Sequence, residues 1–257
     1  MEYSGNAIYD YVKEKKLRYY FSTDHTWLLV YGDTTSIPKI MVFANRVNNL
    51  SNKCSFEELN AFNKAYNISK YLNLPFLYVR FMVNSMMINI WEEKVGKWRE
   101  VTYDQLRDIY ELYGVVQPGT AKKPVNQYVS SPYHDWQRQN LGTITVTDFD
   151  LVKYVDNDIK KVVELKRSKI DINLWNPFHN DFANFALLIN TIIGSHKNIK
   201  FCLYYNVMKA GIAGMRVEDI SKIKVFDFII PSTMISRDEV QFKLRGIYSL
   251  EQLFDER

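Results

Sequence analysis

Cysteine is scarce in this chain of 257 residues, which has only Cys54 and Cys202 and no CxxC pair. A small domain held together by disulfides is therefore excluded, and two reduced, inert thiols are expected. Glycine and proline are also few, at ten and seven residues. Their scarcity excludes collagen-like and low-complexity chains and leaves an ordinary packed protein.

A long apolar run is also lacking. The most apolar stretch, residues 72–91, is interrupted by Arg80, Asn84 and Ser85 before it reaches the roughly 20 residues that a membrane helix needs. The opening sequence MEYSGNAIYDYVKEKK has no apolar region behind a basic one, so no secretory signal is predicted. We therefore expect a soluble, cytoplasmic protein without a membrane partner.

Neither sign of charge is in large excess. Lys and Arg number 33 against 29 Asp and Glu, which gives a formal net charge of +4. A protein that coats nucleic acid without specificity carries a stronger basic field. Any contact with nucleic acid is therefore expected to be local. The hydrophobic content of 47% is sufficient for packed cores in one or two domains.

A proline-rich segment divides the chain nearly in half. Residues 117–132, QPGTAKKPVNQYVSSP, contain three of the seven prolines and are predicted to form a linker, because proline interrupts helices and central strands. The flanking parts, residues 1–116 and 133–257, show the same predicted order of helices and strands. This pattern predicts an α/β protein with two similar lobes that arose by internal duplication.

Several segments of the two halves align at a slowly growing offset. KIMVFANR, starting at Lys39, aligns with KKVVELKR, starting at Lys160, and FLYVRF at Phe76 aligns with FCLYYN at Phe201. The offset is 121 for the first pair and 125 for the second, near 135 for MINIWEE against KIKVFDF, and near 145 for TYDQL against SLEQL. Loop insertions in the second half would produce this drift.

A predicted hairpin carries the strongest chemical signal. Its first strand, within residues 143–154, contains Asp148 and Asp150, and its second contains Glu164 and Lys166. Alternate side chains of a strand share a face, so pairing the two strands brings Asp150, Glu164 and Lys166 together. Unpaired charges on a buried face are costly, and a hard divalent cation such as Mg²⁺ would compensate for the carboxylates.

This hairpin resembles the PD-(D/E)xK phosphodiesterases, which include restriction enzymes, resolvases and recombination nucleases. The resemblance covers about residues 133–206 and implies a restriction-endonuclease-like mixed sheet flanked by helices. It implies that Asp150 and Glu164 bind Mg²⁺, with Mn²⁺ as a substitute, and that the main-chain carbonyl of Leu165 completes the metal ligands. Lys166 would then assist the attacking water. Phe149 stands where the family motif has proline.

Further residues are assigned to the site as accessories. Asp148 is the rival of Asp150 for the aspartate position, and Asp135 or Gln137, on the helix before the hairpin, could join the site. A basic cluster flanks the hairpin and could neutralise phosphates, although a solvated strand edge explains it almost as well. Its members are Lys153, Lys160, Lys161, Arg167 and Lys169.

The resemblance implies a Mg²⁺-dependent endonuclease acting on double-stranded DNA. The most specific form of this expectation is a sequence-specific restriction-type enzyme. A structure-specific resolvase or repair nuclease is one alternative, and a catalytically idle DNA-binding or assembly protein is another. The first half has Thr26, Phe43 and Asn45 where the second has Asp150, Glu164 and Lys166. That half is therefore expected to bind DNA or form an interface. One catalytic set per chain favours a homodimer for a double-strand break.

Overall fold

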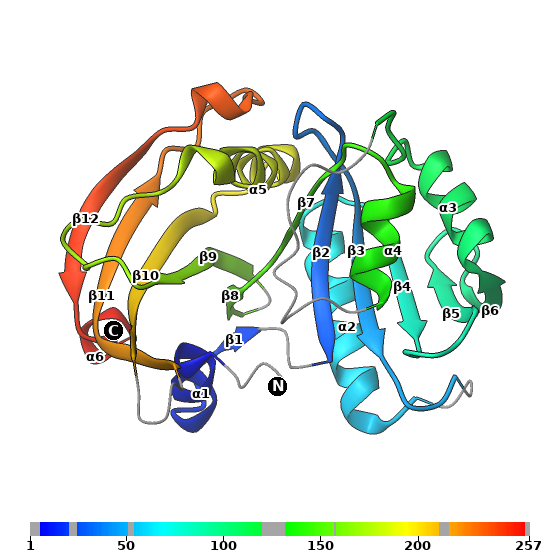
Figure 1. The fold of residues 1–257 in the computed structure, drawn as a ribbon, viewed down its shortest axis with the longest axis horizontal. Helices are drawn as coiled ribbons and strands as arrows, with labels where there is room; N and C mark the ends of the chain where they lie inside the picture. The colour runs from blue at the N-terminus through cyan, green and yellow to red at the C-terminus, as the bar shows by residue number, and fades with distance from the viewer. Residues whose placement is uncertain are drawn as a thin grey trace.

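The protein is a mixed α/β fold with two six-stranded mixed sheets flanked by helices (Figure 1). The computed structural model describes residues 6–20, 25–50, 54–119, 132–156, 158–210 and 216–254. The predicted linker at residues 117–132 lies mostly outside these ranges. Within the described ranges, no helix has the length and apolar character needed to cross a membrane. Cys54 and Cys202 are free thiols.

The described residues of the first half form three helices and six strands. In chain order they are α1 (Ala7–Glu14), β1 (Tyr19–Tyr20), β2 (Thr26–Gly32), β3 (Pro38–Arg46), α2 (Phe56–Tyr71), β4 (Phe76–Phe81), β5 (Met87–Glu92), β6 (Lys97–Thr102) and α3 (Tyr103–Leu112).

The described part of the second half contributes the same succession of elements, with the short 3-10 helices η1 and η3 added. In chain order they are α4 (Pro132–Asn140), β7 (Thr145–Asp148), β8 (Leu151–Val155), β9 (Asp158–Ser168), η1 (His179–Asp181), α5 (Phe182–Ser195), β10 (Lys200–Ala210), β11 (Arg216–Phe228), η3 (Arg237–Glu239), β12 (Phe242–Tyr248) and α6 (Leu250–Phe254).

Each sheet takes one edge strand from the other half of the chain. Sheet A has the order β1-β8-β9-β10-β11-β12, and sheet B has the order β7-β2-β3-β4-β5-β6. In both sheets the third and fourth strands of these orders pair in parallel, and all other neighbours pair antiparallel. Neither sheet is therefore built from residues 1–116 or 133–257 alone, which differs from the predicted division into lobes.

Three hydrophobic clusters hold the layers together. The central cluster joins the facing sides of both sheets through α2 and α5, with Ala65 and Phe185 among its fully buried members. A second cluster covers the other face of sheet B with α3 and α4. A third covers the other face of sheet A with α1 and α6. Each outer helix pair thus combines one helix from each half (Figure 1).

The strand registers agree with the alignment offsets taken from the sequence. Met41 pairs with Phe76 in sheet B, and the residues 121 and 125 positions later, Val162 and Phe201, pair in sheet A. The helices that follow the last strands begin alike. Thr102 forms a capping box with Gln105, and Ser249 exchanges the corresponding hydrogen bonds with Gln252. Each box satisfies two backbone N–H groups at a helix start.

The strand predicted over residues 143–154 is wrong as a single element. It is divided into β7, which pairs with β2 in sheet B, and β8, which pairs with β9 in sheet A. The chain passes between the sheets at Phe149 and Asp150, where the buried Phe149 donates its N–H to the carbonyl of Leu28 at 2.9 Å. Alternation alone did not indicate the division, because both pieces keep the same polar and apolar pattern.

We expect Gly142→Ala to destabilise the protein by about 2 to 3 kcal/mol. Gly142 has a φ of +77°, and a Cβ there would lie 1.7 Å from the carbonyl oxygen of Gln117. Gly114 is the matched control, because its φ is +70° but its Cβ would meet nothing within 4 Å. Urea unfolding should show a loss of about 1 kcal/mol for Gly114→Ala. Equal losses for both variants would contradict the predicted clash.

Candidate functional site

Glu164 and Lys166 lie on the central strand β9, on the face that α5 covers. Val162 on the same face belongs to the central core, whereas Val163 and Leu165 pack on the opposite side with α1 and α6. This is the alternation expected for a strand with both faces covered. The sequence therefore predicted correctly which residues of β9 share a face with Glu164.

Asp150 lies where the chain enters sheet A, next to β9. Its Oδ2 accepts a hydrogen bond of 2.6 Å from the backbone N–H of Leu165, and its Oδ1 accepts one of 3.0 Å from the hydroxyl of Tyr9. Leu151, the next residue, pairs with Val163 in the β8–β9 hairpin. The hairpin thus brings Asp150 to the segment containing Glu164 and Lys166, as the sequence predicted.

Glu164 and Lys166 form an ion pair at the centre of the site. The ammonium of Lys166 donates to Oε1 of Glu164 at 2.6 Å. Glu164 is only 3% exposed, and its Oε2 is a buried atom without a hydrogen-bond partner in the part of the chain that the structure describes. Lys166 also lies 5.8 Å from the centre of the Phe185 ring on α5. One oxygen of this carboxylate is thus left without a hydrogen-bond donor, which is unusual for a buried polar atom.

The three charged groups shift one another's pKa. Burial raises the pKa of Asp150 well above its usual value, and the charges of Glu164 and Asp148 raise it further. Burial also raises the pKa of Glu164, against the opposing effect of Lys166. For Lys166, burial lowers the pKa, but the carboxylates of Glu164 and Asp150 outweigh burial and raise it. The lysine is therefore held as a cation.

The residues present fit a hard divalent cation. Within the described residues, no three His, Cys, Asp or Glu side chains converge to hold a metal. Mg²⁺ in phosphate-processing sites does not require three, because it commonly takes one or two carboxylates, waters and phosphate oxygens. Glu164 Oε2 has no hydrogen-bond partner among the described residues, and Asp150 retains a lone pair on each oxygen after accepting the two hydrogen bonds described for it. A cation beside them would remove the electrostatic cost that raises both pKa values.

Two more carboxylates act on this site. The charge of Asp148, at the end of β7, raises the pKa of both Asp150 and Glu164. The charge of Asp181, at the start of α5, raises the pKa of Glu164 and Lys166. Asp148 was expected from the sequence as a rival metal ligand. Asp181 was missed, although an acidic residue just before a predicted helix was the available signal.

The helix α4 belongs to the outer layer of sheet B. Gln137 is 2% exposed and accepts a hydrogen bond from the hydroxyl of Tyr31 in the cluster that covers this sheet. Burial lowers the pKa of His134, and the charges of Asp148 and Asp135 oppose this effect. The structure therefore does not bring Gln137 to Asp150 and Glu164, and the described contacts place Asp135 near His134.

The five basic residues of the predicted cluster do not form one patch. Arg167 lies on the opposite face of β9 from Lys166 and is paired with Glu218. Lys160 is exposed and binds Asp158 at 2.7 Å, while Lys161 is 3% exposed. Lys153 lies directly opposite Lys161 in the hairpin, and Lys169 is exposed. The exposed lysines are thus the members accessible to a phosphate backbone.

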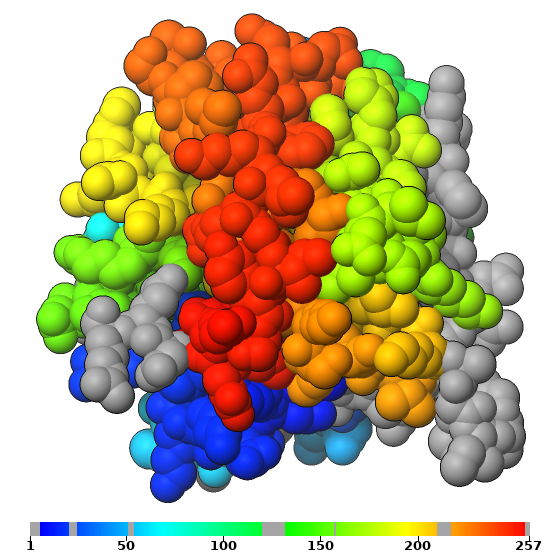
Figure 2. All heavy atoms as spheres, turned by 90° about the vertical axis from the view of Figure 1, so that its left-hand side faces the viewer, coloured from blue at the N-terminus to red at the C-terminus, as the bar shows by residue number. Residues whose placement is uncertain are grey.

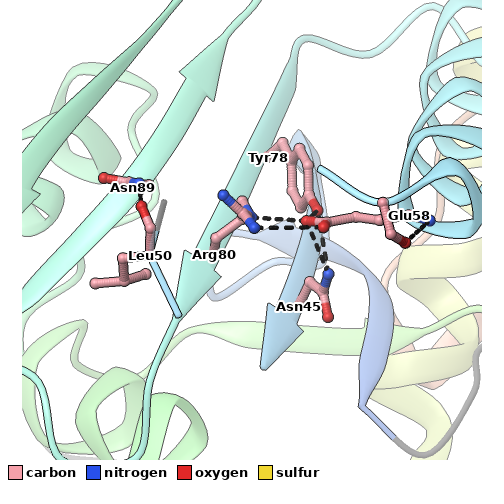
Figure 3. A network of polar contacts seen from close by, with 7 residues as sticks. Asn45, Leu50, Glu58, Tyr78, Arg80 and Asn89 are labelled. Atoms are coloured by element: carbon pink, nitrogen blue, oxygen red, sulfur yellow. Dashed lines mark hydrogen bonds and ion pairs between the residues drawn. The ribbon is translucent and has the colours of Figure 1, made fainter. Parts of the chain in front are cut away.

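Sheet B has a different polar cluster on the corresponding strands (Figure 3). Arg80 Nε lies 2.6 Å from Glu58 Oε1 in a buried ion pair, and Tyr78 donates its hydroxyl hydrogen to the same carboxylate. Asn45, which aligns with Lys166, donates to Glu58 Oε1 at 3.1 Å. This cluster contains one carboxylate, and a guanidinium already compensates its charge.

The register corrects one detail of the predicted comparison between the halves. Leu29 pairs with Val42, and Leu151 pairs with Val163, the residue that aligns with Val42. The residue in the place of Asp150 is therefore Leu28 and not Thr26. Phe43 and Asn45 align with Glu164 and Lys166 as predicted.

The chain matches no family model and no curated protein sequence. Among solved structures, the C-terminal domain of the sex pheromone staph-cAM373 precursor from Staphylococcus aureus is similar at 9% identity and a TM-score of 0.16. That alignment covers 93% of this chain and 72% of the other. A TM-score this low supports no inference about fold or function.

Proposed function

We propose that the protein is a Mg²⁺-dependent endonuclease that hydrolyses phosphodiester bonds in DNA at Asp150, Glu164 and Lys166. The observation that carries the proposal is the buried Oε2 of Glu164, which has no hydrogen-bond partner in the described structure and lies in a site with Asp150 and a cationic lysine. A bound cation explains why two carboxylates with raised pKa values are placed together. A purely structural ion pair would need only one of them.

Each side chain has a role that follows from its chemistry. Asp150 and Glu164 would hold Mg²⁺, which on binding stabilises negative charge on the phosphate and activates water. Lys166 has a raised pKa, so it acts as a hydrogen-bond donor and a positive charge, not as a base. It would orient the attacking water and stabilise the charge that develops on the phosphate oxygens. The backbone N–H of Leu165 keeps Asp150 in place.

The arrangement of sheet A supports the restriction-endonuclease-like proposal. An antiparallel hairpin, β8 and β9, carries the charged residues, and α5 then connects β9 to the parallel strand β10. This is the order of elements that the sequence resemblance implied. A resolvase or repair nuclease would use the same residues, so only the substrate distinguishes it from a restriction-type enzyme.

We also infer that the two halves arose by duplication of one α/β unit. Support comes from the shared strand order, the registers that match at offsets of 121 and 125, and the two capping boxes. In this interpretation sheet B belongs to a unit that has lost the charged site, and it is available for binding DNA or a second copy. One site per chain would cut one strand at a time, so a double-strand break needs a dimer or a second binding event.

A cleavage assay tests the proposed function. The purified protein is incubated with plasmid and phage DNA in Mg²⁺, and the products are separated on a gel. Discrete fragments would indicate a restriction-type enzyme, and a smear would indicate a nuclease of low specificity. If these DNAs stay intact while a branched duplex is cut, the resolvase alternative holds. Intact DNA of every form in Mg²⁺ and Mn²⁺ would contradict the proposal and favour an idle DNA-binding protein.

Calcium is expected to support DNA binding without cleavage. Ca²⁺ binds carboxylates but accepts a looser geometry and more ligands than the octahedral arrangement of Mg²⁺. Gel-shift and cleavage assays on one DNA fragment, in Mg²⁺, Mn²⁺, Ca²⁺ and EDTA, would measure this. Turnover in EDTA, or equal turnover in Ca²⁺ and Mg²⁺, would argue against the metal-dependent mechanism.

A further inference from the structure

The helix α1 belongs to the first half of the chain but packs on sheet A, whose strands other than β1 come from the second half. Ile8 and Val12 are buried against Val163 and other residues of the third hydrophobic cluster. The ring of Tyr11 lies 5.7 Å from that of Phe254 on α6. Figure 2 views this side of the molecule and shows the N-terminal residues in blue directly beside the C-terminal residues in red. The helix α1 therefore has a defined position relative to the site in sheet A.

This packing brings one side chain of α1 to the proposed site. The hydroxyl of Tyr9 donates a hydrogen bond of 3.0 Å to Oδ1 of Asp150, and the Leu165 N–H binds Oδ2. Each oxygen of Asp150 thus has one donor from the protein. The carboxylate is held from two sides, by α1 and by β9, and keeps one lone pair per oxygen for a cation.

Tyr9 lies among acidic residues. Burial raises the pKa of Tyr9 well above its usual value, and the charges of Asp150, Asp148 and Glu164 raise it further. Its hydroxyl is the donor in the hydrogen bond to Asp150. Lys166 supplies the positive charge of the site, and it is paired with Glu164.

We propose that Tyr9 is a positioning residue, which orients Asp150 for metal binding and completes the site of sheet A from the first half of the chain. The inference rests on the proposed function, because it assumes that Asp150 binds a cation. Hydrogen bonds that orient a ligating side chain typically account for about 10- to 100-fold in metal affinity. The first half would then contribute to the reaction directly, through α1, and not only as a surface for DNA or for a second copy.

Removing the single hydroxyl group tests this role. Tyr9→Phe keeps the ring, which packs against the third hydrophobic cluster, and removes the hydrogen bond to Asp150. Tyr11→Phe is the matched control, since it makes the same change on the same helix at a ring that contacts Phe254. The full-length variants are titrated with Mn²⁺ by calorimetry in the absence of DNA, and the melting temperature of each metal-free protein is measured.

We expect Tyr9→Phe to bind Mn²⁺ about 10- to 100-fold more weakly than the wild type, with a melting temperature close to that of Tyr11→Phe. Cleavage by Tyr9→Phe should need a correspondingly higher Mn²⁺ concentration for half-maximal rate, while the rate at saturating Mn²⁺ changes little. An unchanged Mn²⁺ affinity in Tyr9→Phe would overturn the proposal. Equal weakening in Tyr11→Phe would also overturn it, because it would indicate a general effect of disturbing α1.

Asp150→Asn separates this proposal from the proposed function. If the wild type binds Mn²⁺, Asp150→Asn does not, and Tyr9→Phe equals the wild type, only the role of Tyr9 is wrong. If the wild type does not bind Mn²⁺, or if Asp150→Asn binds it equally well, the proposed metal site is wrong. The proposed role of Tyr9 is then wrong as well.

Discussion

Glu164→Gln is expected to lower the DNA cleavage rate by about 10²- to 10³-fold, the scale associated with losing one group that stabilises charge in a transition state. Glutamine has nearly the same volume, and its carbonyl oxygen can still accept the hydrogen bond from Lys166. The variant therefore removes the negative charge of a residue that is 3% exposed with little change in packing. The measurement is the cleavage rate on one DNA fragment at saturating Mg²⁺.

Lys166→Met should cause a loss of similar size, because it removes the cation that would face the phosphate in the proposed mechanism. Lys70→Met is its control, because this lysine is exposed, is paired with Glu93 and lies outside the proposed site and the basic cluster. We expect less than about a threefold change for Lys70→Met, because an exposed ion pair contributes little. Melting temperatures would show that all three variants fold. Cleavage at the wild-type rate by either Glu164→Gln or Lys166→Met would disprove the site assignment.

Arg80→Met is expected to destabilise the protein by about 3 to 5 kcal/mol, because it leaves the carboxylate of Glu58 buried without its cation. Arg80 is 3% exposed, and its guanidinium also lies 5.7 Å from the centre of the Trp98 ring. The remaining donors to Glu58, Asn45 and Tyr78, are neutral. Urea unfolding monitored by circular dichroism would measure the loss.

The matched comparison is the ion pair of Lys70 with Glu93, at 2.7 Å, whose lysine side chain is 56% exposed. Lys70→Met should cost less than about 1 kcal/mol, because solvent screens the pair. Similar losses for Arg80→Met and Lys70→Met would contradict the conclusion that Arg80 compensates a buried charge in sheet B. Retained cleavage activity in folded Arg80→Met would further show that the Glu58 cluster has a structural role.

The alignment of the two halves was readable from the sequence because it depends on local patterns. One local pattern is the run of apolar residues shared by KIMVFANR and KKVVELKR, which is typical of a strand covered on both faces. Another is the glutamine that follows three residues after Thr102 and after Ser249. Such signals are short-range, since they reflect strand periodicity and helix capping. For the same reason, the sequence could predict that Glu164 and Lys166 share a face of their strand and lie close to Asp150 across a hairpin.

The sequence did not indicate that β1, from the first half, joins sheet A and that β7, from the second half, joins sheet B. A strand of two residues, Tyr19–Tyr20, carries no periodicity, and the break at Phe149 and Asp150 keeps the alternation of one continuous strand. Which sheet an edge strand joins depends on where its chain neighbours pack. In this protein α1 is buried on sheet A and α4 on sheet B.

The same distinction applies to the residues of the site. Sequence alone was enough to propose Asp150, Glu164 and Lys166 as a site, since two carboxylates and a lysine at strand spacing favour one by their chemistry. Only the tertiary structure decided that Tyr9 binds Asp150 and that Asp181 acts on Glu164, while Gln137 lies in another cluster. Tyr9 and Asp150 are 141 positions apart. A contact over that separation is set by the packing of a helix against a sheet, and no local pattern records it.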